Sequence, residues 1–275
     1  ILCVVLGHLW VHVSAQEPLL VFSGDAVAMF LVLSAFGLTL SWQHRPLGFP
    51  DFVLKRMVRV MIPYWSVTVC ILALDWILLE KQYSLTQLAL TFAGINVNTE
   101  LYQIDYARWY VTFILCWYLI FFIGMTYIQK RSLFFLVIAG SMFIINYYYI
   151  HLPWYQFMAF PSGYLLAKHY TRFNTVIERH SHRLWLLCIG GILGGIALKI
   201  LIIKGMIDPL VPSIVLMGIK ELVSLVLCGA AILFTGLTGM QNKQSAAFVF
   251  LGGISYELYL LHGVFLVKYN PFFLS

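Results

Sequence analysis

The sequence contains little charge of either sign. Asp, Glu, Lys and Arg make up 10% of its 275 residues, whereas an ordinary soluble domain has about 25%. Hydrophobic residues make up 61%, which excludes a soluble globular protein because too few polar side chains remain to cover a surface in water. The apolar runs reach the roughly 20 residues that a membrane-crossing helix needs, and few contain the alternating polar residues of a barrel strand. The composition therefore predicts an all-α polytopic bundle of transmembrane helices.

Metal-binding and disulfide patterns are also absent. The five cysteines fall inside apolar runs, and their spacing fits neither a metal site nor a disulfide framework. They are Cys3, Cys70, Cys116, Cys188 and Cys228. We expect small buried hydrophobic residues at these positions and no metal site. The formal net charge of +6 does not indicate a nucleic-acid partner, because the basic residues lie in loops between apolar runs.

The apolar runs divide the chain into nine visible crossings of one domain, residues 1–275. Because the first run already begins at Ile1, we expect a clipped N-terminus and nine or ten spans in all. The expected spans are 1–14, 22–42, 61–79, 109–128, 132–150, 154–170, 184–203, 212–236 and 248–267. The span at 154–170 is short and contains Pro161 and Gly163, and such broken helices are tolerated where the backbone lines a protein cavity.

The loops sort by charge and predict an orientation. The connections after the second, fourth, sixth and eighth spans hold eleven Lys and Arg residues, and those on the opposite side hold four. The positive-inside rule places the basic group in the cytoplasm. The loop 80–108 then lies on the outer face, where it can meet an extracytoplasmic substrate.

Ionisable residues inside a membrane are costly and are therefore candidates for function. His8 and His12 are four residues apart and share a helix face. A histidine serves as a general base near neutral pH or as a structural hydrogen-bond donor, and the residue alone favours neither role for His8. Asp25 opens the second span. It is suited to orient a histidine or to stabilise a helix N-terminus as a carboxylate.

The stretch FVLKRMVRVMIPYW, residues 52–65, sets three basic residues against an apolar run. Arg56 and Arg59 are three apart and lie on one helix face. Two guanidinium groups can hold a phosphate through bidentate hydrogen bonds, which suits the phosphates of a cytoplasmic acyl-CoA. A membrane-boundary anchor is the alternative, and charge alone favours that anchor.

Five stretches in order resemble motifs of the family-three integral membrane acyltransferases, the acyltransferase 3 family. The quoted stretches are VVLGHLW (4–10), AVAMFLVLSAFGL (26–38), FVLKRMVRVMIPYW (52–65), ARWYVTFILCWYL (107–119) and LGGISYELYLLHGVFL (251–266). They resemble in turn the family's opening helix with a lone His, its Leu-Ser-Gly-Phe pattern, its Arg-x-x-Arg signature, its Trp-led helix and its C-terminal Tyr-Leu-x-His signature. The chain departs from the family at Ala35, where the pattern has Gly. Ile114 and Leu115 stand where many members have Glu.

The resemblance implies an O-acyltransferase that moves an acyl group, usually acetyl, from acyl-CoA to a hydroxyl of a cell-surface glycan. It implies His8 as the catalytic base and Arg56 and Arg59 as the donor-binding pair. Asp25, which is suited to orient a histidine, is the second catalytic candidate. The remaining motif residues carry no assigned role and are Ser34, Trp109, Tyr118, Ser255, Tyr256 and His262. The expected partners are acyl-CoA (acetyl-CoA foremost), a glycan or lipid-linked sugar acceptor and membrane lipid, with no metal and no nucleic acid. The expected location is the bacterial cytoplasmic membrane.

Two rival functions fit some of the same residues. A transporter or flippase of a lipid-linked glycan or small solute is consistent with Lys199, Glu221 and Glu257 inside spans, although the inverted repeats typical of transporters are absent from the sequence. An acyltransferase of the other large membrane-bound class, which acts on lipids or proteins, would use a late histidine, and His262 is then the candidate.

Overall fold

The structure is a computed structural model that describes residues 2–14, 20–96, 104, 108–150, 156–239 and 246–269. These residues form helices and contain no strand, which confirms the predicted all-α class. The α-helices are α1 (Leu2–Ser14), α2 (Leu20–His44), α3 (Phe49–Arg56), α4 (Ile62–Leu79), α5 (Leu85–Phe92), α6 (Trp109–Tyr127), α7 (Arg131–Ile145), α8 (Ala159–Lys168), α9 (Tyr170–Ile203), α10 (Ser213–Thr238), α11 (Ala246–Gly253) and α12 (Ser255–Gly263). Short helical turns are η1 (Met57–Met61), η4 (Asn146–Ile150), η5 (Asp208–Leu210) and η7 (Val264–Lys268).

Each predicted span coincides with a helical segment, but the segments differ in length. Six helices within the described residues are long and apolar enough to cross a membrane. They are Gly24–His44, Phe49–Leu79, Trp109–Tyr127, Arg131–Tyr149, Tyr170–Ile203 and Ser213–Thr238. The helices at the other three predicted spans are shorter: α1, α8, and the sequence α11–α12–η7, which is interrupted.

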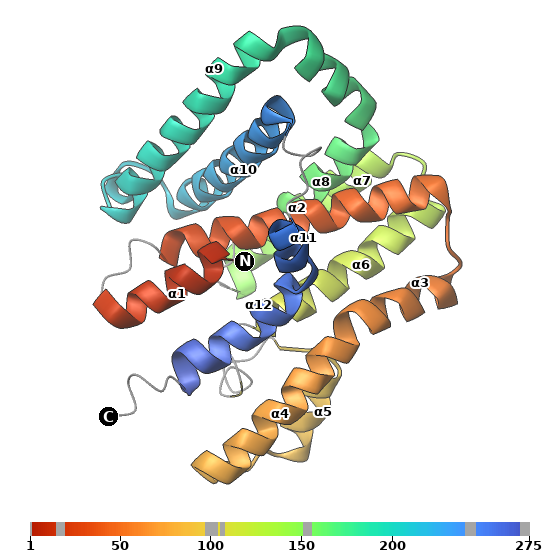
Figure 1. The fold of residues 1–275 in the computed structure, drawn as a ribbon, viewed down its shortest axis with the longest axis vertical. Helices are drawn as coiled ribbons and strands as arrows, with labels where there is room; N and C mark the ends of the chain where they lie inside the picture. The colour runs from red at the N-terminus through yellow and green to blue at the C-terminus, as the bar shows by residue number, and fades with distance from the viewer. Residues whose placement is uncertain are drawn as a thin grey trace.

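Helix α2 lies at the centre of the bundle. It crosses the middle of Figure 1, with α9 and α10 above it and α6 and α4 below it. It packs against α1, α8 and α10, and its contact with α8 is close because Gly163 lies against the α2 backbone. A Cβ atom at Gly163 would stand 2.1 Å from the carbonyl oxygen of Val32.

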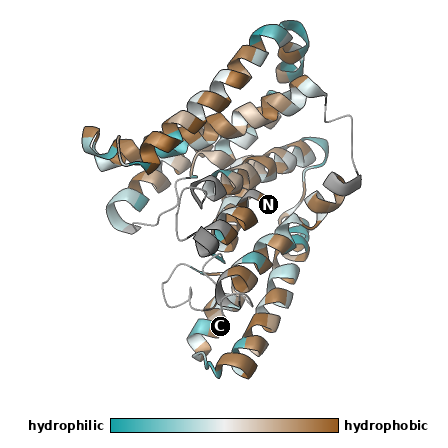
Figure 2. Ribbon diagram, turned by 60° about the vertical axis from the view of Figure 1, so that its left-hand side comes forward, coloured by the Kyte–Doolittle hydropathy of each residue, from teal (hydrophilic) through white to brown (hydrophobic). Residues whose placement is uncertain are grey.

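Apolar side chains also cover the outside of the molecule. Hydrophobic residues follow the long helices, and hydrophilic ones lie mostly near helix ends (Figure 2). Trp76, Leu186 and Leu187 are 70%, 74% and 66% exposed, which suits contact with lipid. The same surface includes Cys70 and Cys116, so the expectation that all five cysteines are buried is wrong for these two. Cys188 and Cys228 are buried as predicted, and the side chain of Cys3 lies outside the described residues.

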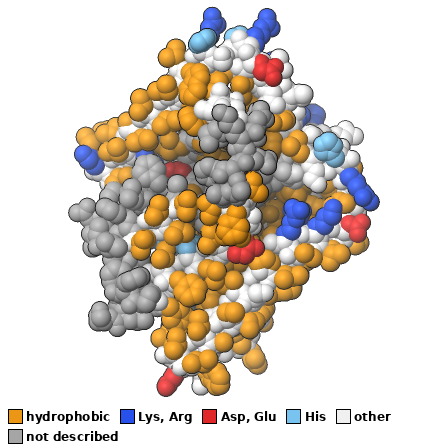
Figure 3. Space-filling model, viewed as in Figure 1, with side chains coloured by type: hydrophobic (Ala, Val, Ile, Leu, Met, Phe, Trp, Pro, Cys, Tyr) orange, Lys and Arg blue, Asp and Glu red, His pale blue; other side chains and the backbone are white. Residues whose placement is uncertain are grey.

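Basic residues gather at one end of the bundle. Lys and Arg side chains are grouped along the upper and right-hand edges of Figure 3, over the bend in α9 and the connection from α2 to α3. The bend in α9 falls at His180, where φ is −128° and ψ is 30°, so the predicted basic loop before residue 184 is helical. This grouping of positive charge marks the cytoplasmic end under the positive-inside rule.

The predicted outer loop 80–108 contains a short helix, α5. Ser84 caps its N-terminus in a capping box with Gln87, a pattern that the sequence Ser-Leu-Thr-Gln contains. The phenol of Tyr64 donates to the carbonyl oxygen of Thr91 at 2.8 Å, and the indole of Trp65 donates to that of Phe92 at 2.8 Å. These bonds tie α5 to the start of α4.

Candidate active site

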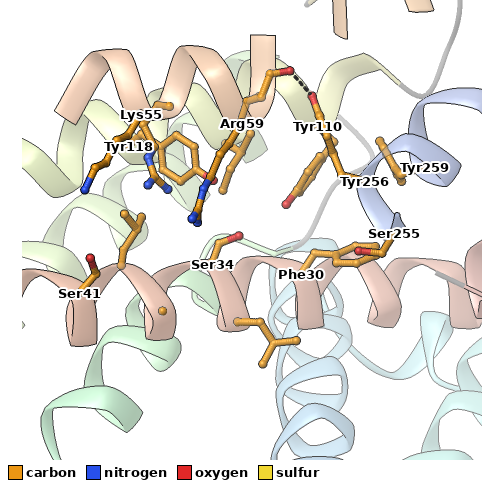
Figure 4. A pocket seen from close by; sticks show the side chains of 16 residues that line it. Phe30, Ser34, Ser41, Lys55, Arg59, Tyr110, Tyr118, Ser255, Tyr256 and Tyr259 are labelled. Carbon is orange, nitrogen blue, oxygen red and sulfur yellow. Dashed lines mark hydrogen bonds between the residues drawn. The ribbon is translucent and has the colours of Figure 1, made fainter. Parts of the chain in front are cut away.

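A cavity of about 460 Å³ lies between α2, the α3–η1 segment, α6 and α12. The volume is in the range of pockets that hold small molecules and cofactors. One end is lined by Ser41 and Lys55, with Arg59 next along the wall, and the other end by Phe30, Ser255 and Tyr259 (Figure 4). The wall is thus basic at one end and aromatic at the other.

Proline shapes the helix that carries the arginines. Pro63 has no N–H and its ring clashes with the carbonyl four residues earlier, which is that of Arg59. The chain responds with the π-helical turn η1, in which the N–H of Ile62 donates to the carbonyl oxygen of Met57, five residues back. Such turns are frequent at functional sites, and this one carries Arg59 on the cavity wall.

Both predicted donor-binding arginines line the cavity, in different surroundings. The guanidinium of Arg56 lies 5.8 Å from the ring centroid of Phe52 and 5.4 Å from that of Tyr118. Its Nε is buried and has no hydrogen-bond partner among the described atoms. Arg59 is more exposed. Cation–π contacts and a hydrogen bond to Tyr118 hold Arg56 in place, while its Nε donor stays available to an anion.

Four motif residues of unassigned role also line this cavity: Ser34, Tyr118, Ser255 and Tyr256. The phenols of Tyr110 and Tyr118 both contact Ser34. Ser255 donates to the carbonyl of Gly252 at 2.9 Å, so its hydroxyl is satisfied within its own helix turn.

Tyr256 links α12 to the arginine segment. Its hydroxyl donates to the carbonyl oxygen of Val60 at 3.1 Å, the bond drawn in Figure 4. Trp109 does not line the cavity and packs on the rings of Tyr110 and Phe113.

The two predicted histidines of different spans meet in the structure. The ring centroids of His8 and His262 are 5.1 Å apart, and Tyr259 lies 5.1 Å from His262. Nδ1 of the buried His262 hydrogen-bonds to the carbonyl oxygen of Tyr259. Because a carbonyl only accepts, Nδ1 carries a proton. His8 does not line the cavity, and Tyr259, which does, lies between the cavity and the pair.

Asp25 is bound to other helices rather than to a histidine. Its carboxylate pairs with Lys199 of α9 and accepts a hydrogen bond from Ser224 of α10. The side chains of Lys199 and Asp25 are 7% and 12% exposed. The expectation that Asp25 orients His8 is therefore not supported by its contacts, which fix α2 to α9 and α10. Asp25 is the sixth residue of α2 and therefore lies beyond its first turn.

The sequence did not single out several residues of the cavity, among them Lys55, Tyr110 and Tyr259. Lys55 lines it beside the arginines, although its charge pattern indicated an ordinary anchor. Tyr110 and Tyr259 also line it, and no local pattern separates a cavity tyrosine from one that packs between helices. Among the described residues no group of three His, Cys, Asp or Glu side chains could hold a metal ion.

The described residues thus form a polytopic helical bundle with a cavity that is basic at one end and aromatic at the other. The sequence model of the acyltransferase 3 family, described as an acyltransferase domain, matches residues 1–275. The chain belongs to this family and is a multi-pass membrane acyltransferase. No curated protein and no solved structure matches it significantly.

Proposed function

We propose that this protein transfers an acyl group, foremost acetyl, from acyl-CoA to a hydroxyl of a cell-surface glycan or its lipid-linked precursor. The bacterial cytoplasmic membrane is the proposed location. The observation that carries the proposal is the cavity, which runs from Lys55, Arg56 and Arg59 to Tyr259. Acyl-CoA is a long anion with a thin thioester arm, and this wall offers cations at one end and aromatic side chains along the rest.

The donor enters from the cytoplasmic side in this proposal. Arg59 and Lys55 meet the phosphates at the mouth, and Arg56 offers its unpartnered Nε–H further in. Charge-assisted hydrogen bonds to phosphate are about twice as strong as neutral ones. The acyl thioester then lies toward Tyr259 and the histidine pair.

His8 is the proposed general base. Its neutral imidazole takes the proton of the acceptor hydroxyl while that oxygen attacks the thioester carbonyl. The carbon–sulfur bond breaks, and the thiolate of CoA leaves and is protonated. General-base assistance contributes about 10²–10⁴-fold in rate. His262 lies against His8 and is the proposed positioning residue.

The base assignment is tested with purified protein in lipid vesicles and radiolabelled acetyl-CoA. We expect His8→Ala to lower turnover by about 10²–10⁴-fold with an unchanged unfolding temperature. His169→Ala is the matched control, because His169 is exposed at the cytoplasmic end, and it should retain turnover. Full turnover in a folded His8→Ala protein would refute the assignment.

The donor site is tested by equilibrium binding of acetyl-CoA. Replacing Arg56 or Arg59 with Gln should raise the dissociation constant about tenfold or more, since a hydrogen bond to a charged group contributes about 1.5–3 kcal/mol. Arg172→Gln, at an exposed site on α9, is the control. Unchanged donor binding in the double variant would leave the pair as topology anchors.

The acceptor is tested by mass spectrometry of surface glycans from cells with and without the gene. A mass difference of one acetyl group on a sugar is the expected result. Substrate flux across vesicles without consumption of acyl-CoA would favour the transporter instead.

A further inference from the structure

A second cavity, of about 410 Å³, lies on another face of α2 at the cytoplasmic end. Thr39, Trp42 and Gln43 of α2 form one wall. The other lining residues are Pro46, Met125 of α6, Arg131 of α7, and Tyr164 and Lys168 of α8. None of its lining residues lines the donor cavity. Its position follows from the close packing of α2 on α8, which brings the two helix ends together beside the start of α7.

The cavity has two cations and no acidic lining residue. Nε of Arg131 is buried and lacks a hydrogen-bond partner among the described atoms. The ammonium of Lys168 donates to the hydroxyl of Ser132 at 2.9 Å, which holds it near Arg131. No ion pair joins either cation to a carboxylate in the described part of the chain. Two converging positive charges without a counter-ion, one of them with a buried free donor, provide the chemistry of an anion site.

We propose that this second cavity binds a phosphate group. The guanidinium of Arg131 supplies paired N–H donors that match phosphate oxygens, and Lys168 adds a point charge. Trp42 supplies an aromatic, apolar wall for the part of the ligand that is attached to the phosphate. Two carriers have this chemistry at the cytoplasmic face of a membrane: the headgroup of an anionic phospholipid and the nucleotide end of a CoA ester.

Aromatic contacts link the second cavity to the donor cavity. The ring of Trp42 lies 6.3 Å from that of Phe52, and Phe52 lies beneath the guanidinium of Arg56. Trp42 of the second cavity thus reaches Arg56 of the donor cavity through the ring of Phe52. The phosphate site itself rests on Arg131 and Lys168 and does not depend on the donor role proposed for Arg56.

The test measures binding and does not use acyl transfer. The variants are Arg131→Gln and Lys168→Gln, and the matched control is Lys130→Gln, because Lys130 is adjacent and exposed. One probe is phosphatidylglycerol against phosphatidylcholine in nanodiscs, read as bound lipid by native mass spectrometry. The other is adenosine 3′,5′-bisphosphate, read by calorimetry. Thermal unfolding of each variant checks that it is folded.

We expect one probe to bind wild-type protein, with its affinity about tenfold weaker in each cavity variant and unchanged in the control. Loss of phosphatidylglycerol retention identifies the lipid headgroup as the ligand, and loss of nucleotide binding identifies the CoA end. The proposal is overturned if neither probe binds, or if the control weakens binding as much as the cavity variants. Arg131→Lys, which keeps the charge, should retain part of the affinity if Arg131→Gln fails to fold.

Discussion

The buried pair of Asp25 and Lys199 gives the sharpest prediction from the structure. Lys199→Met leaves the Asp25 carboxylate with Ser224 as its remaining described side-chain partner, in a site where the carboxylate is 12% exposed. Breaking a buried ion pair on one side costs about 3–5 kcal/mol, because the other charge stays buried. Asp25→Asn should cost a similar amount. The double variant Asp25→Asn with Lys199→Met should cost far less than the sum, because neither charge is left behind.

The measurement is the free energy of unfolding of each purified variant in bicelles, by denaturant titration. Lys204→Met is the control, since Lys204 is exposed at the end of α9, and it should unfold like the wild type. Additive single and double costs, or single costs below about 1 kcal/mol, would refute the reasoning. The double variant also tests the predicted catalytic role of Asp25. Wild-type turnover in a folded double variant means that the carboxylate is structural, and its loss means that Asp25 takes part in the chemistry.

Two further predictions concern packing and pH. Gly163→Ala should lower the free energy of unfolding by about 1–3 kcal/mol, because its Cβ would clash with the carbonyl of Val32. Gly140→Ala is the control and should cost nothing, because no atom lies within 4 Å of the added Cβ. Equal losses of stability in the two variants would contradict the contact at Gly163. Burial and the hydrogen bond to Asp75 raise the pKa of the Tyr83 phenol above its ordinary value. The protonated phenol of Tyr83 therefore stabilises the fold below about pH 10, and this stabilisation is lost at higher pH. The unfolding temperature between pH 8 and 11 should depend less on pH in Tyr83→Phe than in the wild type. The same pH dependence in both proteins would contradict this.

The spans were predictable because lipid demands a long apolar run, and such runs are local. Both α2 and α10 follow directly from their composition. The arginine segment was harder, since its charges suggest a loop or boundary. In the structure Phe49–Leu79 is one continuous helical stretch, because the π turn before Pro63 absorbs the missing hydrogen bond. Periodicity does not reveal a π turn, although a proline one turn after an arginine pair indicates where one can form.

The lining of the donor cavity was predictable only where a motif supplied it. Arg56 and Arg59 stand out as charges next to an apolar run, and charge in that position is rare. Tyr110 and Tyr259 do not stand out, because the chain holds 16 tyrosines and most environments in a helical bundle accept one. Which tyrosines line the cavity depends on which helices pack together, for example α12 against α4 and α1.

The environment of the proposed base shows the same dependence on distant partners. A carboxylate near a histidine span suggests a His–Asp pair, but Lys199, which lies 174 positions after Asp25 in the sequence, binds that carboxylate instead. We infer that the orientation of His8 depends on His262. Nδ1 of His262 is bound to the carbonyl of Tyr259, and the ring held in this way lies 5.1 Å from the ring of His8. Contact with a second imidazole can orient the proposed base without placing a carboxylate charge beside it in the membrane interior.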